Sequence, residues 1–175
     1  VGGTAHATAL HLELRLDVLD RALQGGDLVV TDSHRGEVQR HIEAYRLDLA
    51  AKDLYEFTWN EYCDWYLELS KPILQDDNLS ESEKALTRNT LITVLEALLR
   101  CLHPITPFIT EEIWQKIGPL AGKQGSTIML QPYPLVEPGH IDPTSEVTIE
   151  WMMALLLGIR RIRGEINIAP GKPLK

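Results

Sequence analysis

Cysteine is scarce in this 175-residue sequence, and no long apolar run occurs. Two cysteines, Cys63 and Cys101, are too few for a disulfide framework or a four-ligand zinc site, so we expect a reducing, cytoplasmic compartment. Both lie in apolar helical patterns and are expected to be small core residues. No segment approaches the roughly 18 apolar residues of a membrane span, and the N-terminus lacks the pattern of a secretion signal, so no membrane contact is expected.

Recognisable catalytic motifs are also missing. The sequence contains neither a glycine-rich phosphate loop nor a serine-hydrolase elbow. Its six histidines form no metal-ligand cluster, and His34 and His41, seven residues apart, would need further ligands. Glu111 and Glu112 fall in the first turn of a helix, where negative charge suits the dipole, rather than forming a catalytic pair. We therefore predict no catalytic residue, no cofactor-binding residue and no metal site.

Positive charge is in short supply as well. The chain has 17 Lys and Arg against 25 Asp and Glu, a net charge of −8, which argues against an indiscriminate nucleic-acid binder. The exception is residues 151–175, where five basic side chains stand against Glu165 alone. This segment either contacts a polyanion locally or forms the solvated last turn of a helix, where cations suit the dipole. Its basic residues are Arg160, Arg161, Arg163, Lys172 and Lys175.

Hydrophobic periodicity predicts mostly helices. Residues 1–36 form a lead that is a helix or a hairpin, ending in a loop over 27–36. A long helix without internal Gly or Pro is predicted over 37–69. At about 100° per residue, four of its aromatic residues fall on one stripe, with Trp65 beside the stripe and Phe57 elsewhere, as expected for the centre of a bundle. The stripe consists of Tyr55, Trp59, Tyr62 and Tyr66.

Proline and capping residues mark the next boundaries. Pro72 ends or kinks the aromatic helix, since it cannot donate a backbone hydrogen bond. Ser80 and Glu83 have the spacing of a reciprocal capping box, and the helix that they open runs to about residue 102. Thr106 followed by Pro107 then starts a short helix.

The C-terminal part mixes extended and helical segments. Gly118-Pro119 stops the short helix, and a short extended segment is predicted near 126–134, with a strand at 127–130. A final helix opens at Asp142-Pro143, and residues 166–168 are predicted to be extended. The inward-facing side chains of the final helix are Ile149, Met152, Met153, Leu156, Ile159 and Ile162.

These elements predict an all-α antiparallel bundle of four to five helices over residues 37–165, followed by an irregular tail over 166–175. Glu96 and Arg100 have the (i, i+4) spacing of a surface ion pair worth a few tenths of a kcal/mol. Trp65, Trp114 and Trp151 are either core residues or stacking platforms for bases. Pattern alone indicates a helical binding or scaffolding domain, without naming its ligand.

Four segments in register resemble one known family. Residues 54–69 read LYEFTWNEYCDWYLEL and are followed by Lys71-Pro72. Residues 102–111 read LHPITPFITE, residues 127–132 read TIMLQP, and residues 166–174 read INIAPGKPL. Together they resemble the anticodon-binding domain of bacterial valyl-tRNA synthetases, and the resemblance covers residues 37–175.

The resemblance implies a parent class I enzyme that attaches valine to its tRNA with ATP and magnesium. That activity needs a Rossmann domain with His-x-Gly-His and Lys-Met-Ser-Lys-Ser signatures, neither of which occurs here. We therefore expect a non-catalytic domain whose partners are the tRNA for valine and the catalytic domain of the same polypeptide. An isoleucyl- or leucyl-tRNA synthetase is the nearest alternative. A helical protein-interaction module without an RNA role, and a stand-alone metalloenzyme, are alternatives of other classes.

One departure from the family concerns RNA binding. The family reads the anticodon mainly from an earlier helix with an Asn-Lys-x-x-Asn-x-x-Arg-Phe pattern, which residues 1–36 lack. RNA contact is therefore predicted from basic side chains, and binding by this chain alone is expected to be weak. The candidate contacts are Arg160, Arg161, Arg163 and Lys172, with Arg88, Arg100 and Lys71 as outliers.

Overall fold

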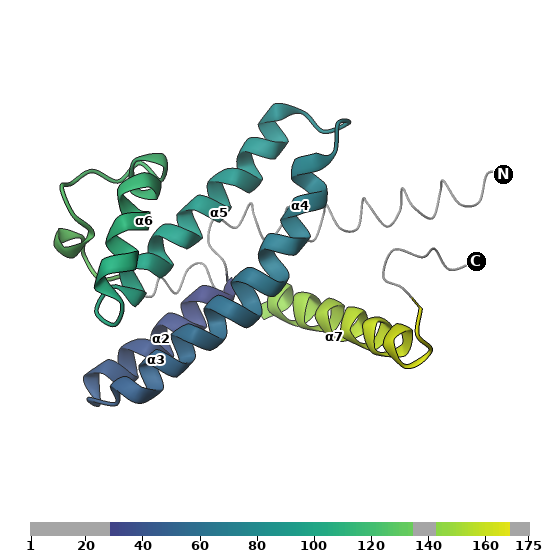
Figure 1. The fold of residues 1–175 in the computed structure, drawn as a ribbon, viewed down its shortest axis with the longest axis horizontal. Coiled ribbons are helices and arrows are strands. Elements are labelled where there is room, and N and C mark those ends of the chain that lie inside the picture. Colours follow the sequence, from purple (N-terminus) through teal and green to yellow (C-terminus); the bar gives the residue numbers. More distant parts are fainter. Residues whose placement is uncertain (1–28, 135–142, 169–175) are drawn as a thin grey trace. The chain divides into compact units, whose positions relative to one another are not determined.

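Helices make up nearly all the regular structure in the two stretches that the computed structural model describes, residues 29–134 and 143–168 (Figure 1). Those stretches contain no strand, so the all-α prediction is confirmed. The chain divides into two units, one spanning Leu19–Ile141 and the other combining Val1–Val18 with Asp142–Lys175. The helix or hairpin predicted within residues 1–28 lies outside the described residues.

Two helices replace the loop and the first part of the long helix predicted from sequence. α2 spans Val29–Glu43 and α3 spans Leu47–Glu56. The loop predicted over 27–36 is therefore wrong from residue 29 onward, and the continuous helix predicted over 37–69 is wrong at residues 44–46. α2 and α3 lie side by side in Figure 1.

The break between α2 and α3 is a Schellman motif formed without glycine. The Arg46 N–H donates to the His41 carbonyl at 2.8 Å, and the Tyr45 N–H donates to the Ile42 carbonyl at 3.0 Å. Tyr45 takes the left-handed conformation that this motif requires, with φ of 57°. A tyrosine is an uncommon residue there, which is why the sequence carries no stop signal at this point.

The aromatic segment is a π-helix over Phe57–Leu67, continuous with α3 before it and with α4, Glu68–Gln75, after it. A π-helix closes hydrogen bonds from residue i to residue i+5, so side chains share a face at wider spacing than in an α-helix. Phe57, Tyr62 and Trp65 are consequently the buried residues. The predicted stripe is wrong for Tyr55 and Trp59, which are 64% and 57% exposed.

Pro72 lies inside α4 and does not end it, because the helix continues to Gln75. After a short loop, α5 spans Glu81–Leu102. The predicted capping box at its start is confirmed: the Ser80 hydroxyl accepts from the Glu83 N–H, and the Glu83 carboxylate accepts from the Ser80 N–H at 2.8 Å. This box satisfies two backbone donors that the helix start would otherwise leave unpaired.

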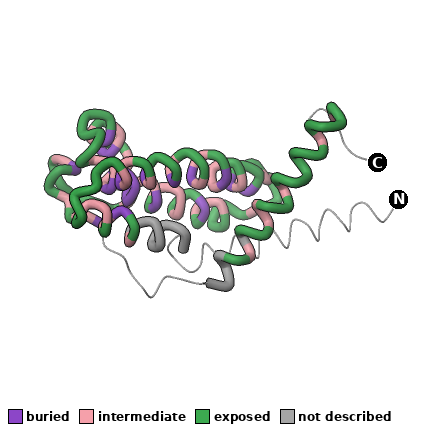
Figure 2. Tube along the Cα trace, turned by 90° about the horizontal axis from the view of Figure 1, so that it is seen from below, coloured by how far each residue is buried: buried purple, intermediate pink, exposed green. Residues whose placement is uncertain are grey.

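The main core of this unit lies among α2, α3, the π-helix and α5, where the buried residues of each helix face the others (Figure 2). Cys101 is buried, which confirms its predicted core position, whereas Cys63 is half-buried and packs against the edge of the core. The core consists of Val38, Ala50, Leu54, Phe57, Tyr62, Val94, Leu98 and Cys101.

A second cluster holds α6, Pro107–Leu120, against α5. It consists of Leu99, Trp114 and Ile128, all at most 3% exposed. The Thr106-Pro107 start is confirmed, whereas Gly118-Pro119 does not stop the helix before Leu120. The strand predicted at 127–130 is wrong: Ile128–Leu130 forms a 3₁₀ turn, η2, which the Thr127 hydroxyl caps by accepting from the Met129 N–H at 3.2 Å.

In the other unit, α7 spans Pro143–Glu165. Met152, Met153 and Leu156 are half-buried, as predicted for the inward face. Ile159 and Ile162 are 41% and 59% exposed, so their predicted inward orientation is wrong. The side chain of Ile149 lies outside the described residues, as do residues 169–175 of the predicted tail.

Candidate nucleic-acid interface

Three of the predicted RNA contacts lie together near the C-terminal end of α7. Arg160 is exposed and Arg163 is half-buried. The Arg161 side chain is 82% exposed, and its Nε donates to a Glu165 carboxylate oxygen at 3.1 Å. An exposed (i, i+4) pair contributes only a few tenths of a kcal/mol, so a phosphate can displace this carboxylate readily. The three arginines form the densest group of cations in the described residues.

The backbone beyond these arginines turns sharply instead of extending as predicted for 166–168. Asn167 is left-handed, with φ of 54°, and its N–H donates to the Gly164 carbonyl at 3.1 Å. The Ile168 N–H donates to the Arg163 carbonyl at 2.9 Å. This Schellman motif consumes two of the carbonyls at the helix end. Lys172, the fourth candidate of this segment, lies outside the described residues.

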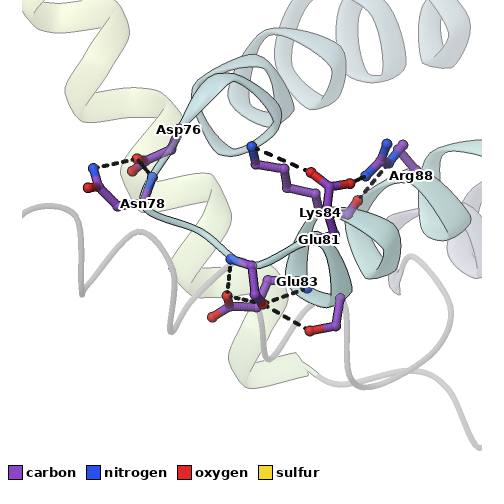
Figure 3. Close-up of polar contacts among 8 residues, drawn as sticks. Asp76, Asn78, Glu81, Glu83, Lys84 and Arg88 are labelled. Atoms are coloured by element: carbon purple, nitrogen blue, oxygen red, sulfur yellow. Dashed lines mark hydrogen bonds and ion pairs between the residues drawn. The ribbon is translucent and has the colours of Figure 1, made fainter.

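Lys71 and Arg88 lie on the other unit and are both paired with carboxylates. Lys71 is an exposed side chain on α4 that forms an ion pair with Glu68. Arg88, on α5, donates from Nη2 to Glu81 at 2.7 Å, and Lys84 approaches the other oxygen of that carboxylate (Figure 3). A phosphate would have to displace an existing partner at each of these cations.

The junction of α4 and α5 is acidic, and hydrogen bonds lower the pKa values of three of its carboxylates, Asp76, Glu81 and Glu83. Hydrogen bonding to Arg88 lowers the pKa of Glu81, and hydrogen bonding to Ser80 lowers the pKa of Glu83. The pKa of Asp76 is lowered chiefly by the hydrogen bond from the Asn78 backbone N–H, at 2.9 Å (Figure 3). These negative charges make this end of the unit an unfavourable surface for a nucleic-acid backbone.

Arg100 is a structural residue rather than a surface cation. Its Nε and Nη2 donate to one oxygen of Glu96 at 3.1 and 2.8 Å, and its Nη1 donates to the Pro132 carbonyl at 2.8 Å. Trp114 Nε1 donates to the other Glu96 oxygen at 3.0 Å. The predicted ion pair between Glu96 and Arg100 is confirmed, but its predicted surface location is wrong, because the Glu96 side chain is 1% exposed and that of Arg100 13% exposed.

Glu111 ties the segment around η2 to α6. Its carboxylate accepts from the Thr127 hydroxyl at 2.7 Å and from the Ile128 N–H at 3.2 Å. The hydrogen bond from Thr127, followed by that from Gln115, lowers the pKa of Glu111. Its neighbour Glu112 is exposed and pairs with Lys116 at 3.2 Å. Neither arrangement resembles a general acid and base pair, because the two carboxylates have separate partners.

The burial of the aromatic side chains differs from what the sequence pattern predicts. Trp65 and Trp114 are core residues, at 8% and 1% exposed, whereas Trp151 on α7 is 66% exposed. Tyr55 and Trp59 are exposed platforms that the helical wheel had assigned to the core. For Trp59, a helical wheel drawn at 100° per residue carries no signal of this exposure, because Trp59 lies in the π-helix, whose longer period displaces the buried face.

Two histidines, His41 and His103, have local partners. His41 Nε2 lies 3.2 Å from Asp53, and His103 Nδ1 lies 2.8 Å from the Thr110 hydroxyl. Within residues 29–134 and 143–168, no three His, Cys, Asp or Glu side chains are grouped so as to hold a metal ion. In the same residues, no helix is both long enough and apolar enough to cross a bilayer.

The arrangement matches a known family of domains. A family model for the anticodon-binding domain of tRNA ligase matches residues 29–175. The match begins at residue 29, where α2 begins, and includes all the described elements through α7. A domain of this kind has tRNA as its partner, in agreement with an exposed arginine cluster and exposed aromatic rings. The chain therefore belongs to the family of anticodon-binding domains of tRNA ligases.

Proposed function

We propose that this chain is the tRNA-recognition domain of a valine-tRNA ligase, whose catalytic domain attaches valine to the tRNA with ATP and magnesium. The observation that carries the proposal is the run over residues 54–69, which resembles valyl enzymes. Its aromatic residues Phe57, Tyr62 and Trp65 are buried where the π-helix meets the bundle. Part of the resemblance thus lies in residues that build the fold, and part in the exposed rings of Tyr55 and Trp59. Isoleucyl- and leucyl-tRNA synthetases share the helical plan and are the alternative.

In this proposal the α7 arginines provide the main contact with the phosphate backbone. A guanidinium offers several donors in a planar fork that suits a phosphate, and Arg160 and Arg161 are exposed. Arg161 and cations of the other unit alike start from established ion pairs, as at Arg161 with Glu165, Arg88 with Glu81 and Arg46 with Asp48, so the advantage of α7 is the close spacing of its three arginines. Displacing those carboxylates costs part of the energy that an RNA contact would contribute.

Exposed aromatic rings supply the second kind of contact. Bases in RNA loops are unstacked and bind by stacking on aromatic faces. Tyr55 and Trp59 lie four residues apart where α3 meets the π-helix, and Trp151 lies on α7. We assign these three rings as candidate stacking platforms, in place of Trp65 and Trp114.

The amino-acid specificity is tested with the intact ligase that contains this domain. Valine, isoleucine and leucine are each supplied in an ATP–pyrophosphate exchange assay. We expect exchange to be supported by valine at a kcat/KM at least about a hundredfold above that for leucine, the scale on which a well-shaped pocket discriminates. A preference for isoleucine or leucine would show that the domain belongs to the ligase for that amino acid.

The RNA role is tested in the same enzyme by changing Arg160, Arg161 and Arg163 to Glu. We expect the KM for tRNA to rise at least about tenfold, because phosphate contacts are lost, while valine-dependent exchange stays unchanged. Arg46→Glu, at an exposed arginine of the other unit, is the matched control and should leave the KM nearly unchanged. An unchanged KM in the triple variant would favour a protein-interaction role instead.

A further inference from the structure

We draw no further inference here: the strongest candidate, the surface patch of exposed apolar side chains on α6 and η2 (Phe108, Met129 and Leu130), carries none, because nothing in the structure shows what covers it.

Discussion

Glu96 joins three parts of the chain through its two carboxylate oxygens. One oxygen accepts from Trp114 on α6, and the other accepts from Arg100, which in turn donates to the carbonyl of Pro132 after η2. The free-energy cost of burying these charges is offset only because each charge has a partner. Removing one partner therefore destabilises the fold by far more than the net stabilisation that the intact pair provides. The carboxylate thus fixes the position of α6 and η2 relative to α5.

Glu96→Ala is expected to lower the free energy of unfolding by about 3–5 kcal/mol, because it leaves the Arg100 charge and the Trp114 N–H without their acceptor. Glu112→Ala, which removes an exposed (i, i+4) partner of Lys116, is the control and should cost under about 0.5 kcal/mol. Urea titration measures both. Comparable losses in the two variants would show that the buried network is not a source of stability.

Tyr62 makes the fold sensitive to alkali. Burial raises its pKa from 10 to about 12, and its hydroxyl donates to the Leu91 carbonyl at 3.2 Å. Because the folded state favours the protonated form, this contribution to stability is complete below pH 10 and is lost as the pH rises toward 12. Burial also raises the pKa values of Tyr66 and Tyr133, which act in the same direction.

Tyr62→Phe should therefore do two things. At neutral pH it should lower the free energy of unfolding by about 1 kcal/mol, through the lost hydrogen bond. Above pH 10 it should make the fall of stability with pH less steep than in the parent chain. Denaturant titrations across this range measure both effects, with Tyr55→Phe, at a 64% exposed position, as the control. Parallel pH profiles for the parent chain and Tyr62→Phe would refute the assignment.

At the scale of elements, three helices end in the same motif with different residues in its left-handed position. α6 uses Gly122 with φ of 70°, α7 uses Asn167, and α2 uses Tyr45. Glycine and asparagine are the residues that adopt this conformation at least cost, whereas a tyrosine adopts it at a cost of about 1 kcal/mol. α2 therefore ends where tertiary packing requires it, against local preference.

Tyr45→Gly is expected to raise the free energy of unfolding by about 0.5–1 kcal/mol, since the strain is relieved and the 91% exposed ring makes little contact to lose. Ala44→Gly, one residue earlier and without a positive φ, should instead be destabilising. Thermal unfolding of both variants provides the comparison. A lower stability for Tyr45→Gly would mean that the tyrosine ring makes a contribution that its exposure does not suggest.

At the scale of the whole molecule, most of the basic side chains lie in residues 29–134, where acidic side chains outnumber them. In residues 29–134 most basic side chains are matched with a carboxylate within a turn or two of the same helix, as at Lys52 with Glu56. Such pairing keeps the surface nearly neutral around each pair. The net charge of the whole chain is −8. If the α7 arginines contact the tRNA as proposed, a polyanion meets three closely spaced cations there and net negative charge over residues 29–134.

The 175-residue chain alone should therefore bind the anticodon stem-loop of the valine tRNA weakly, with a dissociation constant above the micromolar range in physiological salt. Affinity should rise steeply as salt is lowered, with a slope set by about three phosphate contacts. Changing Arg160, Arg161 and Arg163 to Gln should remove most of that slope. A fluorescence anisotropy titration measures it, and sub-micromolar binding in physiological salt would contradict the prediction.

The sequence by itself determined the features that depend on near neighbours in the chain. The capping box at Ser80 and Glu83, the α6 start at Pro107, and the apolar setting of Cys101 follow from local spacing and side-chain chemistry. Each of these features involves groups within a few residues of one another, so no knowledge of the fold is needed.

Only the tertiary structure decided the features that arise from packing between distant segments. The break at Tyr45, the π period that exposes Trp59, and the burial of Glu96 beneath Trp114 all run against the local pattern. Each is a local cost offset by contacts that form only after the helices assemble, through core burial or a buried hydrogen bond. Hydrophobic periodicity and helix propensity describe only near neighbours in the chain. They therefore cannot predict features that depend on contacts between distant segments.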